Sequence, residues 1–161
     1  MKKISIADAT LVGLAETLSF KEKIETARLL DRLQPDVIEL PMIKNATADT
    51  LFIRTVCAFV KNSAVSVPAE LSEESVKAAA AAVASAKHAV LRIEVPVSPV
   101  GMEYKSHMKP QKVLNAAETV FKTAAELCTD CELYAADATR ADIEFLKQII
   151  DIAIENGIKK I

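Results

Sequence analysis

Polar side chains that could do chemistry follow several short apolar runs in this 161-residue sequence. Asp8 comes at the far end of the first run, Glu39 ends the second, and Lys105 lies in a longer segment after the fourth. A carboxylate can hold a divalent cation, and a lysine can meet a carboxylate or a phosphate. Asp8 could equally accept backbone N–H bonds of the next loop, and Glu39 and Lys105 could simply be solvated.

The apolar runs predict strands, and the segments between them predict helices. The expected strands are residues 4–10, 36–40, 64–67 (closed by Pro68), 89–97 and 132–137, with a sixth starting at 158–161. The expected helices start at Ser19, at Thr47 or Ala48, at Ser72, near Pro110 and at Asp142. Ser19 and Glu22 have the spacing of a capping box, and Gly157 is typical of a helix C-cap.

The alternation of strands and helices with short connections predicts a parallel sheet with right-handed crossovers. A closed (β/α)₈ barrel usually needs about 250 residues. We therefore expect an α/β fold, a partial (β/α)₈ TIM barrel of about five βα units, in which residues 1–161 form the N-terminal portion of one domain and the C-terminal strands are absent. The alternative is an open doubly wound sheet, but the chain has 3 glycines and no glycine-rich phosphate turn after the first strand.

Composition excludes several classes of partner. The net charge of −2 arises from interspersed acids and bases, and 4% of the residues are aromatic, so nucleic acid is not an expected ligand. Neither a secretory leader nor an apolar span of transmembrane length occurs, which predicts a cytoplasmic protein without a membrane partner. The 3 cysteines fit a reducing compartment.

Several stretches in combination resemble one family. These stretches are Asp-Ala-Thr-Leu at 8–11, Met-Glu-Tyr-Lys at 102–105 and Asp-Ala-Thr-Arg-Ala-Asp at 137–142, supported by 36–39 and 144–157. They are similar to the HMGL-like metallolyase family, which contains 2-isopropylmalate, homocitrate and citramalate synthases and hydroxymethylglutaryl-CoA lyase. The similarity spans nearly the whole chain.

The resemblance implies a fold, a reaction and a cofactor. Family members are (β/α)₈ barrels that make or break a carbon–carbon bond next to a metal-bound keto or hydroxy acid, usually with an acyl-CoA. The resemblance places Asp8 as a ligand of a divalent metal ion (Mg, Mn or Zn), if the site is retained, and Thr10, Glu39 and Lys105 as substrate contacts. The family's remaining ligands, a pair of histidines, belong to later strands.

Three positions depart from the family pattern. The arginine of Asp-x-Thr-Leu-Arg is Val12, the histidine before Met102 is Gly101, and the fifth-strand glutamate is Ala136. These residues offer no acid, base or oxyanion donor, so the catalytic residues are unknown. The open alternatives are altered or lost chemistry, a non-catalytic small-acid-binding or scaffold barrel, and a partial barrel completed by pairing as a homodimer.

Two motifs receive structural interpretations. Asp137 and Arg140 are expected to hold the fifth loop in place, with Thr139 or Asp142 capping the next helix. The pattern Cys-Thr-Asp-Cys at 128–131 has the spacing of redox and zinc sites, but it falls between a helix and a strand, opposite the expected active site. We interpret that spacing as a chance occurrence.

Other candidates are left open. Arg92 and Glu94 alternate on one face of the fourth strand, and the sequence does not decide whether that face is buried or exposed. His107, in the long loop after this strand, is better placed for chemistry than His88, which precedes the strand.

Overall fold

The computed structural model describes residues 4–161, so residues 1–3 of the predicted domain 1–161 lie outside the described part. The strands are β1 (Ala7–Asp8), β2 (Val37–Glu39), β3 (Ala64–Ala69), β4 (Ala89–Pro96) and β5 (Cys131–Ala136). The helices are α1 (Thr10–Gly13), α2 (Phe20–Leu33), α3 (Ala48–Phe59), α4 (Glu73–Val83), α5 (Pro110–Leu127) and α6 (Ile143–Glu155), with a π-helical turn η1 (Gly101–Ser106) and a 3-10 turn η2 (Ala138–Arg140).

The five described strands form a sheet whose order, β1-β2-β3-β4-β5, follows the chain. The pairs β1–β2, β2–β3 and β4–β5 are parallel. Beyond β5, Glu132 forms a parallel bridge with Lys160, where the sequence predicted a sixth strand to begin. The α/β class with chain-order parallel strands, as in a partial (β/α)₈ barrel, is therefore confirmed.

Two predicted strands differ from the structure by more than one residue at an end, and the second, fourth and fifth differ by one residue. The first strand was expected over residues 4–10, but the regular strand is Ala7–Asp8 and α1 begins at Thr10. The chain turns because Asp8 Oδ1 accepts a hydrogen bond from the Thr10 backbone N–H at 3.0 Å. Pro68 was expected to close the third strand, yet β3 continues to Ala69. A proline removes one donor from the ladder but can still lie in extended backbone.

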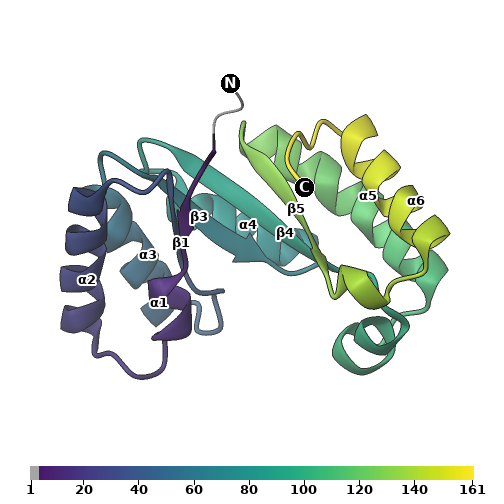
Figure 1. Ribbon diagram of the computed structural model, residues 1–161, viewed down its shortest axis with the longest axis horizontal. Coiled ribbons are helices and arrows are strands. Elements are labelled where there is room, and N and C mark those ends of the chain that lie inside the picture. The colour runs from purple at the N-terminus through teal and green to yellow at the C-terminus, as the bar shows by residue number, and fades with distance from the viewer. Residues whose placement is uncertain (1–3) are drawn as a thin grey trace. The chain divides into compact units, whose positions relative to one another are not determined.

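Contacts divide the chain into two compact units, each with its own core. The first unit comprises Met1–Pro68 with Ala78–Val90. Its helices α2 and α3 lie side by side (Figure 1). Fully or nearly fully buried side chains from its strands and helices form the core: Ala27, Ile38, Ile53, Val56, Val65 and Ala82.

The second unit comprises Ala69–Lys77 with Leu91–Ile161. Helices α5 and α6 lie side by side in it (Figure 1). Its core consists of buried side chains of β4, β5, α5 and α6: Leu91, Ile93, Val95, Val113, Phe121, Leu133 and Ile149. Alternate residues of β4 supply three of these, because successive side chains of a strand point to opposite faces.

The helix ends follow the sequence signals. The predicted capping box is present: Ser19 Oγ accepts from the Glu22 N–H at 3.4 Å, and Glu22 Oε2 accepts from the Ser19 N–H at 2.8 Å. Asp142 caps α6 by accepting from the Phe145 N–H at 2.9 Å. The C-cap of α6 is Asn156 and not Gly157 as predicted; Gly157 is the next residue, with φ +85°, a backbone conformation that glycine adopts without steric cost. None of the described helices is long and apolar enough to cross a membrane.

Candidate functional site

Asp8 and Glu39 lie at the carboxyl ends of neighbouring strands in the first unit. The parallel register pairs Asp8 with Ile38, the residue before Glu39. Both carboxylate residues are half-buried, as is Thr10, whose N–H bonds to Asp8. The structure thus places three of the four predicted site residues at the carboxyl ends of the neighbouring strands β1 and β2.

Metal-ligating side chains do not gather into a full coordination site among the described residues. Within residues 4–161, no group of three or more His, Cys, Asp or Glu side chains is placed to hold one ion. One oxygen of Asp8 already accepts the Thr10 N–H. Magnesium and zinc sites need several protein or water ligands in a fixed geometry. The described residues therefore do not fit a complete metal centre by themselves.

Lys105, the fourth predicted site residue, lies in the second unit beside a pocket of about 250 Å³. Its Nζ is 3.4 Å from Glu94 Oε2, and the Glu94 side chain is 19% exposed. The last residues of β4 and β5, Pro96 and Ala136, also line the pocket. The remaining lining residues are Glu70, Leu71, Ser72, Ser106 and Met108.

The turn η1 positions Lys105. Ser106 Oγ donates a hydrogen bond to the Met102 carbonyl at 3.0 Å, and the Met102 side chain is buried. His107 ends the turn with φ 52°, in the left-handed region. Lys105 therefore follows a buried anchor within a short turn, which directs its ammonium toward β4.

Arg92 and Glu94 share one face of β4, opposite Glu132 and Tyr134 of β5. Arg92 is 8% exposed, and its guanidinium carbon lies 5.2 Å from the centre of the Tyr134 ring, a cation–π contact. The question that the sequence left open is answered in favour of a face that buries Arg92. Glu94 pairs with Lys105 at the pocket-facing end of the same strand.

The three positions that were expected to depart from the family pattern differ in their surroundings. Val12 lies in α1 and is 38% exposed. Gly101 opens η1, where its N–H donates to Ser98 Oγ at 3.0 Å, and a Cβ added to it would lie 3.1 Å from that oxygen. Ala136 lines the pocket that contains Lys105. None of the three side chains can donate or accept a proton.

Asp137 and Arg140, which were expected to hold the fifth loop in place, form an ion pair. Arg140 Nη2 lies 2.7 Å from Asp137 Oδ2 and bridges the turn η2. The Arg140 hydrogen bond holds the pKa of the Asp137 carboxyl below its ordinary value, and the Ser98 hydroxyl acts in the same direction. Asp137 has φ 64°, so the pair fixes a left-handed turn directly after β5. The contacts of Asp137 and Arg140 are those of residues that stabilise the loop after β5.

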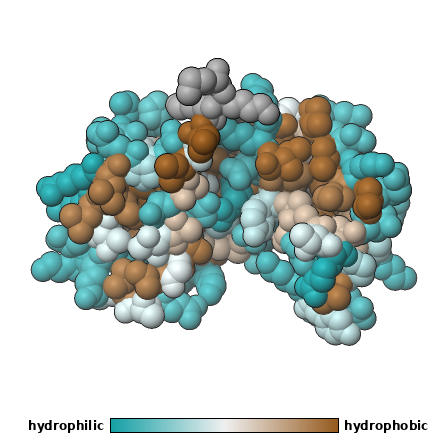
Figure 2. Space-filling view, viewed as in Figure 1, coloured by the Kyte–Doolittle hydropathy of each residue, from teal (hydrophilic) through white to brown (hydrophobic). Residues whose placement is uncertain are grey.

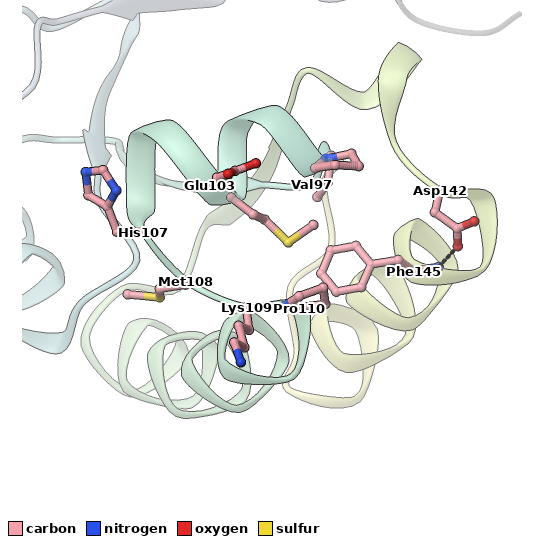
Figure 3. Close-up of a pocket in the computed structure, with 10 residues that line it drawn as sticks. Val97, Glu103, His107, Met108, Lys109, Pro110, Asp142 and Phe145 are labelled. Carbon is pink, nitrogen blue, oxygen red and sulfur yellow. Dashed lines mark hydrogen bonds between the residues drawn. The ribbon is translucent and has the colours of Figure 1, made fainter.

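A larger pocket of about 700 Å³ lies between η1 and the N-terminal ends of α5 and α6 (Figure 3). Figure 3 shows the Phe145 ring pointing into it near Val97, with His107 at the far side and Lys109 pointing away. The lining is largely apolar and includes Met102, Met108 and Pro110 in addition. It suits a hydrocarbon or ring, and His107, which the sequence favoured over His88, lies at its edge.

Comparison with known proteins assigns the fold and the family. The HMGL-like family model matches residues 12–161. The chain belongs to the HMGL-like family. It is 34% identical to the 2-isopropylmalate synthase of Halalkalibacterium halodurans over 98% of this chain and 31% of that protein. It is 37% identical to the enzyme of that name from Thiobacillus denitrificans over 87% of this chain and 27% of that protein.

A solved structure supports the fold at lower sequence similarity. The crystal structure of dihydrodipicolinate synthase from Oceanobacillus iheyensis superimposes with a TM-score of 0.55 and 13% identity, covering 91% of this chain and 55% of that one. The HMGL-like chain therefore shares the arrangement of strands and helices with that protein. It spans about a third of the length of the synthases that it matches.

The contact between Lys105 and Glu94 is the site feature that sequence reasoning missed. Each residue was singled out separately, and the signal that could have joined them was positional. Glu94 lies two residues before the end of β4, and Lys105 lies in the turn that follows that end. A loop that folds back over the end of its own strand brings such residues together.

Proposed function

We propose that the chain forms the β1–β5 part of a barrel, which binds a small keto or hydroxy acid at the carboxyl ends of its strands. Compared with the synthase relatives, the chemistry of this barrel is altered or lost. Family membership supports the reaction class: condensation of an acyl-CoA with a 2-keto acid, or its reverse. The observation that carries the proposal is the pocket of about 250 Å³ beside Lys105.

The chemistry of this pocket suits a short carboxylic acid. Lys105 supplies a cation for the ligand carboxylate, and the Ser72 hydroxyl can donate to a keto or hydroxy oxygen. Ser106 Oγ, whose hydrogen bonds to the Met102 carbonyl, can accept from the hydroxyl of a hydroxy acid. Leu71 and Met108 offer apolar surface for the carbon chain. The positive charge of Lys105 and the apolar surface of Leu71 and Met108 together favour an acid with a few carbons over a large charged ligand.

The replacements support a change in chemistry. A condensation needs a base to remove a proton and donors for the developing oxyanion. Val12, Gly101 and Ala136 supply neither, and Ala136 lies in the pocket lining itself. Asp8, Thr10 and Glu39 remain as carboxylate and hydroxyl contacts on the other strand ends, with Asp8 proposed as the one metal-binding position of this segment.

Calorimetric titration with 2-keto and 2-hydroxy acids tests the binding proposal. We expect Lys105→Met to weaken binding roughly 10- to 100-fold, because a hydrogen bond to a charged group contributes about 1.5–3 kcal/mol. Lys122→Met is the matched control, since Lys122 is exposed on α5 outside the pocket. Equal affinities in the two variants, or no binding to the unaltered chain, would contradict the proposal.

Two further measurements separate an enzyme from a binding protein. The full protein is titrated with Mn²⁺ with and without Asp8→Ala, and acyl-CoA consumption is followed with a panel of 2-keto acids. Metal binding that depends on Asp8, together with consumption of acyl-CoA, supports altered chemistry. Binding of the acid without metal binding and without acyl-CoA consumption supports the non-catalytic alternative.

Self-association is a second candidate, favoured by the exposed segment directly before β1. Ile4 is 83% and Ile6 63% exposed. Figure 2 shows hydrophobic residues at the molecular surface near the top of the view. β1 is the first strand in the sheet order, and an edge strand with exposed apolar side chains is a template for pairing. Sedimentation velocity of the chain and of Ile4→Lys tests this, and a monomer at all concentrations removes the homodimer.

A further inference from the structure

The turn between α5 and β5 carries two cysteines. Cys128 is the C-cap residue of α5 and is half-buried, whereas Cys131 is the first residue of β5 and is 4% exposed. Thr129 and Asp130 separate them. The third cysteine, Cys57, lies in α3 of the first unit and is fully buried.

The two thiols lie on the same side of this turn. Their side chains hydrogen-bond to each other, and Cys131 Sγ is also 3.2 Å from the Cys128 carbonyl oxygen. Cys128 Sγ lies 3.4 Å from the Asp130 carbonyl oxygen. Little rearrangement is needed for one sulfur to reach the other, since the two thiols are already hydrogen-bonded to each other.

Hydrogen bonding around Cys128 favours its thiolate and outweighs the opposing charges. The hydrogen bond from Cys131 lowers the pKa of Cys128 to about 6, against partial burial and the nearby Asp130 carboxylate, which raise it. The C-terminal carbonyls of α5 also oppose a negative charge. Lys160 Nζ lies 2.7 Å from Asp130 Oδ2 and offsets that aspartate. The pKa of Cys131 is raised by Cys128 and by burial.

We propose that Cys128 and Cys131 form a reversible dithiol–disulfide pair that exchanges with low-molecular-weight disulfides such as oxidised glutathione. The half-buried Cys128 thiolate attacks one sulfur of the small disulfide, forming a mixed disulfide and releasing one thiolate. Cys131 then gives up its proton and attacks Cys128 Sγ, which closes the internal disulfide and releases the second small thiol. Two electrons pass from the cysteine pair to the small disulfide, which is reduced to two thiols.

The asymmetry of the pair matches these two roles. An attacking thiol must be reachable and partly ionised, and a resolving thiol must be protected until the first bond has formed. Cys128 is the more exposed of the two and Cys131 the buried one. The five residue steps of β5 from Cys131 to Ala136 span about 17 Å, so this site is separate from the pocket beside Lys105.

Equilibration of the full chain in glutathione redox buffers tests the proposal. We expect the unaltered chain to lose two hydrogens in intact mass, with the disulfide mapped to Cys128 and Cys131. Cys131→Ser is expected to accumulate a glutathione adduct on Cys128, since the resolving thiol is missing. Cys128→Ser is expected to react at least about tenfold more slowly, because the remaining thiol of the pair is buried. Cys57→Ser is the control and should behave as the unaltered chain.

The pH dependence of alkylation is a second readout, and its first measurement uses the unaltered chain. The rate of Cys128 alkylation should reach half its maximum near pH 6. Lys160→Met should move this midpoint upward by exposing Asp130, and Asp130→Asn should move it downward. A midpoint near the ordinary value of about 8.5, a Cys128 adduct that never resolves in the unaltered chain, or equal reactivity of Cys57 would overturn the proposal. The thiols would then serve only as hydrogen-bond donors to the end of α5.

Discussion

The ammonium of Lys105 lies 3.4 Å from a carboxylate oxygen of Glu94, and the two side chains differ in exposure, 67% against 19%. A ligand carboxylate that binds Lys105 must therefore compete with Glu94. We expect Glu94→Gln to tighten the binding of a 2-keto acid roughly threefold to fivefold, because a partly exposed ion pair contributes up to about 1 kcal/mol. Calorimetric titration measures the change.

Glu103→Gln is the matched control for this prediction. Glu103 lies in the same turn η1 but is exposed and lines the larger pocket instead. It should leave the affinity of the acid unchanged. Weaker binding in Glu94→Gln would instead show that the Glu94 carboxylate contacts the ligand, for example by accepting its hydroxyl hydrogen.

Asp31, in the last turn of α2, stabilises the turn that leads into β3. Its carboxylate accepts backbone N–H bonds from Lys61 at 3.1 Å, Asn62 at 2.9 Å and Ser63 at 3.1 Å. Burial works to raise the pKa of Asp31, but these hydrogen bonds outweigh it and hold the pKa below the ordinary value. We expect Asp31→Ala to lower the free energy of unfolding by about 2 kcal/mol, since three donors lose their acceptor.

The depressed pKa of Asp31 also sets the sign of a pH effect. The stabilisation is complete above the unfolded-state pKa of about 3.9 and is lost as the pH falls through the lower folded-state value. Urea unfolding from pH 7 to pH 3 should therefore show a smaller loss of stability in Asp31→Asn than in the unaltered chain. Glu25→Gln, exposed on the same helix, is the control, and parallel pH curves for all three proteins would count against this account.

The sequence predicted the fold well where local chemistry and long-range packing agree. The helix after Ser19 and the one after Asp142 begin at the expected caps because the cap and the apolar face select the same start. The first strand was predicted too long because its apolar pattern continues past the point where Asp8 bonds to the Thr10 N–H. A bond between a side chain and the backbone two residues away leaves no trace in apolar periodicity.

The candidate site was predictable residue by residue, and its contacts were not. Family motifs pointed to Asp8, Glu39 and Lys105, but the partner of Lys105 depends on how η1 folds back over β4. Arg92 was ambiguous for a similar reason, because strand alternation assigns a face without saying what covers it. The thiol pair at 128–131 was dismissed because sequence spacing carries no information on whether two sulfurs point at each other.

The capping box of α2 provides a direct test of helix stability. Ser19 and Glu22 satisfy two backbone N–H groups at the start of the helix, which have no partner inside it. We expect Ser19→Ala to lower the free energy of unfolding by about 1 kcal/mol. Chemical denaturation monitored by circular dichroism measures this. Ser85→Ala is the control, since Ser85 is exposed beyond the end of α4, and an equal loss in both variants would assign the effect to something other than the cap.

Arg140 sets the ionisation of Asp137 at the end of β5, and removing it should change the pH at which this carboxyl titrates. Its hydrogen bond and its charge lower the pKa of Asp137, as does the Ser98 hydroxyl. We expect the Asp137 resonances in Arg140→Met to titrate at higher pH, closer to the ordinary value, so the turn loses its charged carboxylate at a higher pH. NMR titration of the side-chain carbons measures this shift. Lys147→Met, which breaks the Lys147–Glu144 pair on α6, should leave it unchanged. An unshifted Asp137 in Arg140→Met, with a shift in Ser98→Ala, would assign control of the carboxyl to the buried serine.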